Sequence, residues 1–133
     1  MQPQKINNAT KETAEPLSSI SERIEIKAGF DVYTNGTKRV FTDSKYHNLS
    51  TDVFIGPGNP NVVNVKKRGV TWNDFFKTLP MSLTNECLIT GTKQTFCSGE
   101  SGTLKFYINE VEDKDALDKI INEDDELLVE YGK

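Results

Sequence analysis

The stretch that decides the fold reads TWNDFFKTLP, from Thr71 to Pro80. Thr71 and Asp74 have the spacing of the N-cap and N3 residues of a helix capping box, and Pro80 cannot continue a helix. The apolar residues in this stretch recur at i, i+3, i+4 and i+7, at positions Trp72, Phe75, Phe76 and Leu79. We therefore expect one amphipathic helix from about Trp72 to Leu79, with its apolar face in the core rather than against a cofactor.

A hairpin is expected on each side of this helix. Before it, Asn35-Gly36 separates two strand-like runs. Asn-Gly is the strongest short hairpin signal, because a type I′ turn needs positive φ at both central residues. A two-residue loop there sets Phe30 opposite Phe41. After the helix, residues 87–97 have arms rich in Thr, Ile and Phe around a Thr-Gly-Thr-Lys centre, which predicts a second hairpin.

Cys87 and Cys97 are the two cysteines of the chain, and the second hairpin sets them opposite one another. Directly opposed residues of an antiparallel pair have Cα atoms about 4.5 to 5.5 Å apart, which suits a relaxed disulfide. We therefore expect a cross-strand disulfide, which indicates an oxidising compartment. The alternative is a pair of buried free thiols in a cytosolic protein.

Further strands are expected from runs of apolar residues. These runs are 62–65, 104–109 and 127–131. Residues 42–60 between the first hairpin and the first of these strands are expected to form an irregular loop. The order of hairpin, strand, helix, hairpin, strand and strand predicts an α+β fold in which one helix crosses a mixed sheet.

Three segments together resemble a known family. Gly69-Val70-Thr71 opens the helix, 106–110 is an aromatic strand that enters a turn, and 123–131 is an acidic turn before the last strand. These segments are similar to those of β-grasp (ubiquitin-like) domains related to the C-terminal domain of transcobalamin, which also occur in uncharacterised archaeal and bacterial cell-surface proteins. The resemblance covers residues 69–132 and implies a β-grasp-like mixed sheet in an extracytoplasmic protein.

The chain departs from this family at two turns and in its histidine content. Glu110 and Asp124 stand where the family has glycine. Either these turns hold a non-glycine residue at positive φ or they take another shape. The single histidine, His47, is read as a surface residue, because no nucleophile motif lies near it in the sequence. One histidine is also too few for structural zinc or blue copper. We therefore expect no metal, no cofactor and no catalytic residue.

Length and charge limit the partners. The 133 residues suit one domain, and 16 Lys and Arg against 20 Asp and Glu give a net charge of −4. This charge offers no general attraction to nucleic acid or anionic lipid, and the basic run Lys66-Lys67-Arg68 is short. No stretch reaches the roughly 18 apolar residues of a membrane span. Membrane contact would therefore require an anchor that preceded Met1.

The N-terminal segment differs in composition from the rest. Residues 1–22 are polar, with prolines at positions 3 and 16, and predict a flexible arm or tether, which leaves 23–133 as a single β-grasp-like domain. N-x-S/T sequons begin at Asn8, Asn35 and Asn48. These asparagines are candidate glycosylation sites and fit a secreted or cell-surface location.

The sequence thus predicts a non-enzymatic extracytoplasmic domain that binds an unidentified protein or small molecule. A second hypothesis is a structural subunit that assembles with copies of itself, as a homo-oligomer, or with a partner. It would do so through sheet edges or by donating a strand from the segment with Ile20, Ile24 and Ile26. A third is an enzyme that uses a pair of carboxylates, because sequence cannot show whether two acidic side chains converge.

Overall fold

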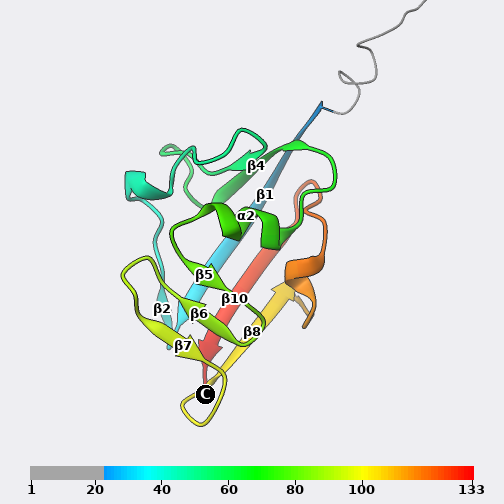
Figure 1. Cartoon of the computed structure of the whole chain (residues 1–133). Helices are drawn as coiled ribbons and strands as arrows, with labels where there is room; N and C mark the ends of the chain where they lie inside the picture. The colour runs from blue at the N-terminus through cyan, green and yellow to red at the C-terminus, as the bar shows by residue number, and fades with distance from the viewer. Residues whose placement is uncertain (1–22) are drawn as a thin grey trace, which may run out of the picture.

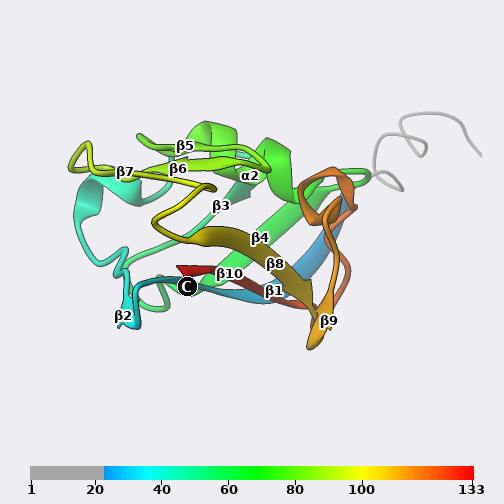
Figure 2. The ribbon, with the colours of Figure 1, turned by 90° about the horizontal axis from the view of Figure 1, so that it is seen from below.

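The computed structural model describes residues 23–133, which form two packed layers (Figures 1 and 2). One layer is a seven-stranded sheet of β1 (Arg23–Thr34), β2 (Thr37–Lys38), β3 (Val53–Phe54), β4 (Val62–Lys67), β8 (Thr103–Ile108), β9 (Val111–Glu112) and β10 (Glu126–Gly132). The other layer holds helix α2 (Trp72–Thr78) and a three-stranded sheet of β5 (Ser82–Leu83), β6 (Cys87–Ile89) and β7 (Thr95–Cys97). Two short 3-10 turns, η1 (Ser44–Tyr46) and η2 (Ala116–Asp118), lie in the connections.

The strand order of the large sheet is β3-β4-β1-β10-β8-β9, with β2 paired to β1. The two long strands β1 and β10 run parallel, with Phe30 opposite Leu127 and Val32 opposite Val129. The remaining pairs of this sheet are antiparallel. The sheet is therefore mixed, and one α-helix of residues 23–133 packs on it, which confirms the predicted α+β class.

Helix α2 forms as its sequence predicts. The Thr71 hydroxyl accepts a hydrogen bond from the Asp74 backbone N–H at 3.1 Å, and the Asp74 carboxylate accepts one from the Thr71 N–H at 3.0 Å. This pair is the predicted capping box. The helix ends at Thr78, with Leu79 as its C-cap just before Pro80. The residues of the predicted apolar face are all buried, namely Trp72, Phe75, Phe76 and Leu79.

The first hairpin also forms where Asn-Gly predicts it. Asn35 and Gly36 have φ of 50° and 82°, as a type I′ turn requires. The ladder between β1 and β2 is short, but the predicted pairing of Phe30 with Phe41 continues beyond it, since the centroids of their rings lie 5.2 Å apart. Phe30 also meets the rings of Phe75 and Phe76 on α2, at 5.3 and 5.8 Å. One aromatic cluster therefore joins this hairpin to the helix.

The second hairpin carries the predicted disulfide. Strands β6 and β7 pair with Cys87 opposite Cys97, and the two sulfurs are bonded. Their Cα atoms are 4.1 Å apart. No free cysteine remains in the chain.

The region of residues 42–60, predicted as an irregular loop, is more ordered than expected. It contains η1 and β3, and Tyr46, Val53 and Ile55 in it are buried. The apolar run around Val53 adds a short strand to the edge of β4. Because these side chains are buried, much of residues 42–60 packs on that end of the core and covers it.

At the two turns where the β-grasp family named above has glycine, this chain holds non-glycine residues in the left-handed backbone conformation. Glu110 has φ of 72° and Asp124 has φ of 64°, so the first of the two predicted options is correct. The buried Asp125 carboxylate ties the turns together. It accepts hydrogen bonds from the Asn109 side-chain amide at 3.1 Å and from the Asn122 backbone N–H at 2.9 Å.

We expect Glu110→Gly to raise the free energy of unfolding by up to about 1 kcal/mol. A non-glycine residue at this φ costs about 1 to 2 kcal/mol of steric strain at its Cβ, which glycine would remove. Glycine also has more conformational entropy in the unfolded chain, which takes back about 0.5 to 1 kcal/mol of that gain. Glu110→Ala is the matched control, since it removes the same side chain but keeps the Cβ. Urea unfolding measures both variants, and a glycine variant less stable than the alanine variant would contradict the strain.

Candidate functional site

Two surface hollows within residues 23–133 are candidate sites. The edge hollow has a volume of about 700 Å³ and is lined by Ile24, Glu25, Asn48, Leu49, Ser50, Thr51, Phe54 and Lys66. The hairpin hollow has a volume of about 210 Å³ and is lined by Val32, Lys38, Arg39, Val40, Phe41, Tyr46, Met81, Leu88, Thr90, Gly91 and Thr92.

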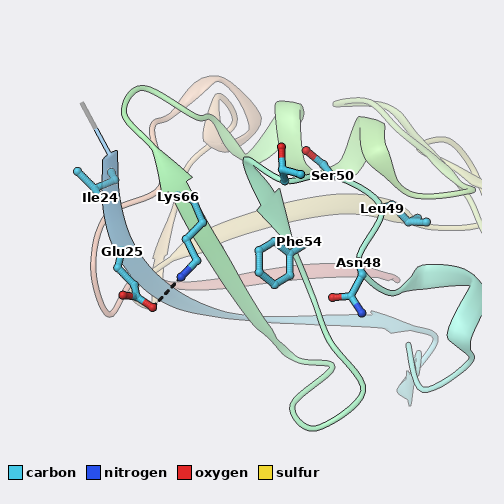
Figure 3. A pocket seen from close by; sticks show the side chains of 8 residues that line it. Ile24, Glu25, Asn48, Leu49, Ser50, Phe54 and Lys66 are labelled. Atoms are coloured by element: carbon cyan, nitrogen blue, oxygen red, sulfur yellow. Dashed lines mark hydrogen bonds and ion pairs between the residues drawn. The ribbon is translucent and has the colours of Figure 1, made fainter. Parts of the chain in front are cut away.

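The edge hollow is broad, and its side chains do not converge (Figure 3). On one side Lys66 Nζ pairs with Glu25 Oε2 at 2.6 Å, while Leu49, which is 45% exposed, points away from Phe54. The hydrogen bond and the positive charge of Lys66 hold the pKa of Glu25 below its ordinary value, with a smaller contribution from the charge of Lys27. On this side of the hollow, the charged groups of Glu25 and Lys66 therefore bind each other rather than a ligand.

We expect Lys66→Gln to raise the pKa of Glu25 toward its ordinary value of 4.5. Lys27→Gln is the control and should raise it less, because the charge of Lys27 is the smallest of the effects on this pKa. Carbon-detected NMR titration of the Glu25 carboxyl measures both values. A depressed folded-state pKa adds stability that is present above the unfolded-state pKa and is lost as the pH falls through the folded-state value. Equal rises in the two variants would contradict the assigned hydrogen bond.

The hairpin hollow is smaller and has an apolar floor. Both predicted hairpins contribute to it: Val32 comes from β1, and Leu88 from β6 is fully buried. Phe41 and Tyr46, from the segment after β2, pack ring to ring with centroids 5.1 Å apart. Val40, which is 65% exposed, stands at the rim. The hollow therefore offers an apolar interior that opens to solvent.

The loop at the tip of the second hairpin forms one wall of the hairpin hollow. The Thr90 hydroxyl accepts a hydrogen bond from the Gln94 N–H at 3.1 Å and lies 3.0 Å from the Thr92 hydroxyl. Gly91 is required at the centre of this loop because a Cβ there would collide with the Tyr46 hydroxyl. The absence of a side chain lets the loop approach Tyr46 and close the wall.

Cations gather around the hairpin hollow. Lys38 pairs with Asp31 at 3.2 Å, and Lys45 Nζ donates to the Gly91 carbonyl at 3.3 Å. Arg39 Nε donates to the Thr34 hydroxyl at 2.7 Å. Within residues 23–133 no carboxylate forms an ion pair with Arg39, and none lines the hollow. The nearest acid in sequence to Lys45 is Asp43, which caps η1 and accepts from the Lys45 backbone N–H at 2.9 Å.

The disulfide braces the side chains behind this hollow. In the β6–β7 ladder, Leu88 stands opposite Phe96, next to the bonded pair of Cys87 and Cys97. The Arg39 guanidinium lies over the Phe96 ring, 5.2 Å from its centroid. The crosslinked hairpin thus supplies part of the floor and the aromatic ring on which the arginine stacks.

The residues named from sequence are spread over the surface. Asn35 and Asn48 are both exposed, and Asn48 lines the edge hollow, while Asn8 lies outside the described residues. His47 is half-buried rather than a simple surface residue, and its Nε2–H donates to the Phe41 carbonyl at 2.9 Å. The site residues that sequence reasoning missed are Arg39 and Tyr46. Nothing local marks them, because the hollow exists only once the two hairpins have packed together.

Three observations complete the description of the site. In the part of the chain that the structure describes, no group of three or more His, Cys, Asp or Glu side chains is placed to hold a metal ion. No helix of residues 23–133 has the length and apolarity needed to cross a membrane. Compared with models of protein families, with curated proteins and with solved structures, the chain shows no significant match.

Proposed function

We propose that this chain is a non-enzymatic, extracytoplasmic binding domain of β-grasp type that takes a ligand in the hairpin hollow. The observation that carries the proposal is the hollow itself, with an apolar floor, a cationic rim and a wall braced by Cys87–Cys97. Apolar pockets with a few converging polar groups are the usual form of small-molecule sites. The lining of the hairpin hollow offers apolar contact area and positive charge, which suit the binding of a ligand.

The disulfide supports the extracytoplasmic location, because such bonds persist mainly in oxidising compartments. The β-grasp assignment draws on helix α2 packed on a mixed sheet and on the acidic turn before β10. In this proposal residues 1–22, which lie outside the described part of the chain, are the tether of the domain, and Asn8, Asn35 and Asn48 are candidate glycosylation sites.

Labelling of intact cells tests the location. A membrane-impermeant amine-reactive biotin reagent, applied to cells that make the protein naturally, should label it before lysis. A cytoplasmic protein in the same cells provides the control and should be labelled only after lysis. If the chain behaves like this control, the extracytoplasmic assignment is wrong.

The alternative, a structural subunit that assembles through sheet edges, has less support. The outer strands β3 and β9 of the large sheet are two residues each, and β5 and β7 of the small sheet are two and three. Short edge strands disfavour pairing with another chain. Ile24 and Ile26 lie in β1, where Ile26 already stands opposite Val65 of β4, and Ile20 lies outside the described residues.

Light scattering of the full chain separates the two functions. A binding domain should remain a monomer over a wide range of concentration. Mass that rises with concentration, and that is lost when residues 1–26 are deleted, would instead favour assembly through a donated strand.

A further inference from the structure

We propose that the hairpin hollow binds a small amphiphile with an apolar body and a single carboxylate, and that this carboxylate pairs with Arg39. The inference rests on the proposed function and specifies the ligand class of that same site.

The size and floor of the hollow set the apolar part of the ligand. Its 210 Å³ equals the share of about seven water molecules in the liquid and lies below the roughly 300 to 1,000 Å³ typical of drug-sized ligands. A molecule of roughly seven to ten non-hydrogen atoms fits this space. Half-buried Met81 and exposed Val40 supply the apolar surface that a ligand can touch, and Leu88, Val32 and Phe41, which are 0%, 1% and 5% exposed, form the apolar base behind it. A short aliphatic chain or one aromatic ring matches that base.

The state of Arg39 sets the polar part of the ligand. Its Nε is engaged by Thr34, and its guanidinium stacks on Phe96, so the plane of the group is held from two sides. No hydrogen bond within residues 23–133 engages its two terminal nitrogens. A held guanidinium with free terminal N–H groups presents the two parallel donors that a carboxylate accepts.

The balance of charge favours a monoanion. Asp31 neutralises Lys38. Lys45 does not line the hollow, and its ammonium donates to the Gly91 carbonyl. Arg39 is thus the one lining cation without a carboxylate partner among the described residues. One unpaired cation compensates one negative charge, whereas a phosphate dianion would bring a second charge next to an apolar floor.

Titration with hexanoate and its neutral isostere hexanamide tests the inference. Two-dimensional ¹H–¹⁵N spectra of the oxidised full chain should show hexanoate shifting the amide signals of Val40, Gly91 and Thr92. Hexanamide should bind at least about tenfold more weakly, since it lacks the charge-assisted pair. Added salt should weaken hexanoate binding and leave hexanamide binding unchanged.

Two arginine variants assign the carboxylate contact. Arg39→Gln should weaken hexanoate binding by about 10- to 100-fold and leave hexanamide binding unchanged. Arg68→Gln is the matched control, because it removes the same charge from an exposed arginine that does not line the hollow, and it should bind hexanoate normally. If Arg39→Gln does not fold, Arg39→Lys replaces it, and the loss of the two-pronged geometry should still weaken hexanoate several-fold.

The outcomes distinguish a failure of the carboxylate inference from a failure of the proposed binding site. Equal binding of hexanoate and hexanamide in the hollow would overturn the carboxylate inference but leave the hollow as the binding site. If neither compound moved the signals of Val40, Gly91 and Thr92, both the inference and the proposed site would be wrong. Equal weakening by Arg39→Gln and Arg68→Gln would show a general charge effect and would also overturn the inference.

Discussion

Phe30→Ala should lower the free energy of unfolding by about 3 to 5 kcal/mol, the usual cost of removing a fully buried phenylalanine. Phe30 is 1% exposed, and its ring contacts those of Phe41, Phe75 and Phe76. The substitution therefore removes the side chain that joins the first hairpin to α2 and leaves a cavity between the two layers. Denaturant unfolding followed by tryptophan fluorescence measures the loss.

Tyr33→Ala is the control for this variant. Tyr33 lies on the same strand, is only half-buried, and belongs to the alternate set of positions on β1, so it points to the opposite face of the sheet. Its replacement should cost about 1 kcal/mol. Similar losses in the two variants would show that the aromatic cluster is not the centre of the core.

Replacing both Cys87 and Cys97 by serine should lower the free energy of unfolding by about 2 to 3 kcal/mol. The bond closes a loop with a sequence separation of 10 residues, and a loop of that length restricts the unfolded chain by about this amount. The melting temperature should fall by roughly 10 °C for a domain of this size. Thermal unfolding followed by circular dichroism measures the change.

Reduction of the wild-type protein gives the matched comparison and should reproduce the loss of stability. At a temperature where the double variant is still folded, it should bind hexanoate, because the disulfide braces the hollow without lining it. A variant of unchanged stability that has lost binding would make the cysteines part of the binding site and would overturn their structural role.

The local features that sequence predicted correctly depend on neighbours within about ten residues. The capping box of Thr71 and Asp74, the Asn35-Gly36 turn and the hairpin of Cys87 and Cys97 each carry their geometric requirement in a short stretch. Steric limits on φ, hydrogen bonding at a helix end and cross-strand spacing act locally. These elements could therefore be assigned without knowing the tertiary structure.

The features that sequence did not predict depend on packing between distant segments. Tyr46 and Gly91 are far apart in the chain, and only the folded structure shows that the glycine is needed to make room for the tyrosine hydroxyl. Arg39 is an ordinary strand-end cation in sequence and gains its place over Phe96 when the two hairpins meet. The parallel pairing of β1 with β10 joins the two ends of the domain, and no local pattern encodes it.

The central claim is that this is a disulfide-braced domain of an oxidising compartment. The most direct test is the intact mass of the protein taken from the cells that make it naturally, with free thiols blocked by an alkylating reagent at the moment of lysis and no reductant added. The account predicts no alkylation and a mass lower than that of the reduced chain by two hydrogen atoms, from the bond between Cys87 and Cys97. A protein in which both cysteines carry the alkyl group would contradict it.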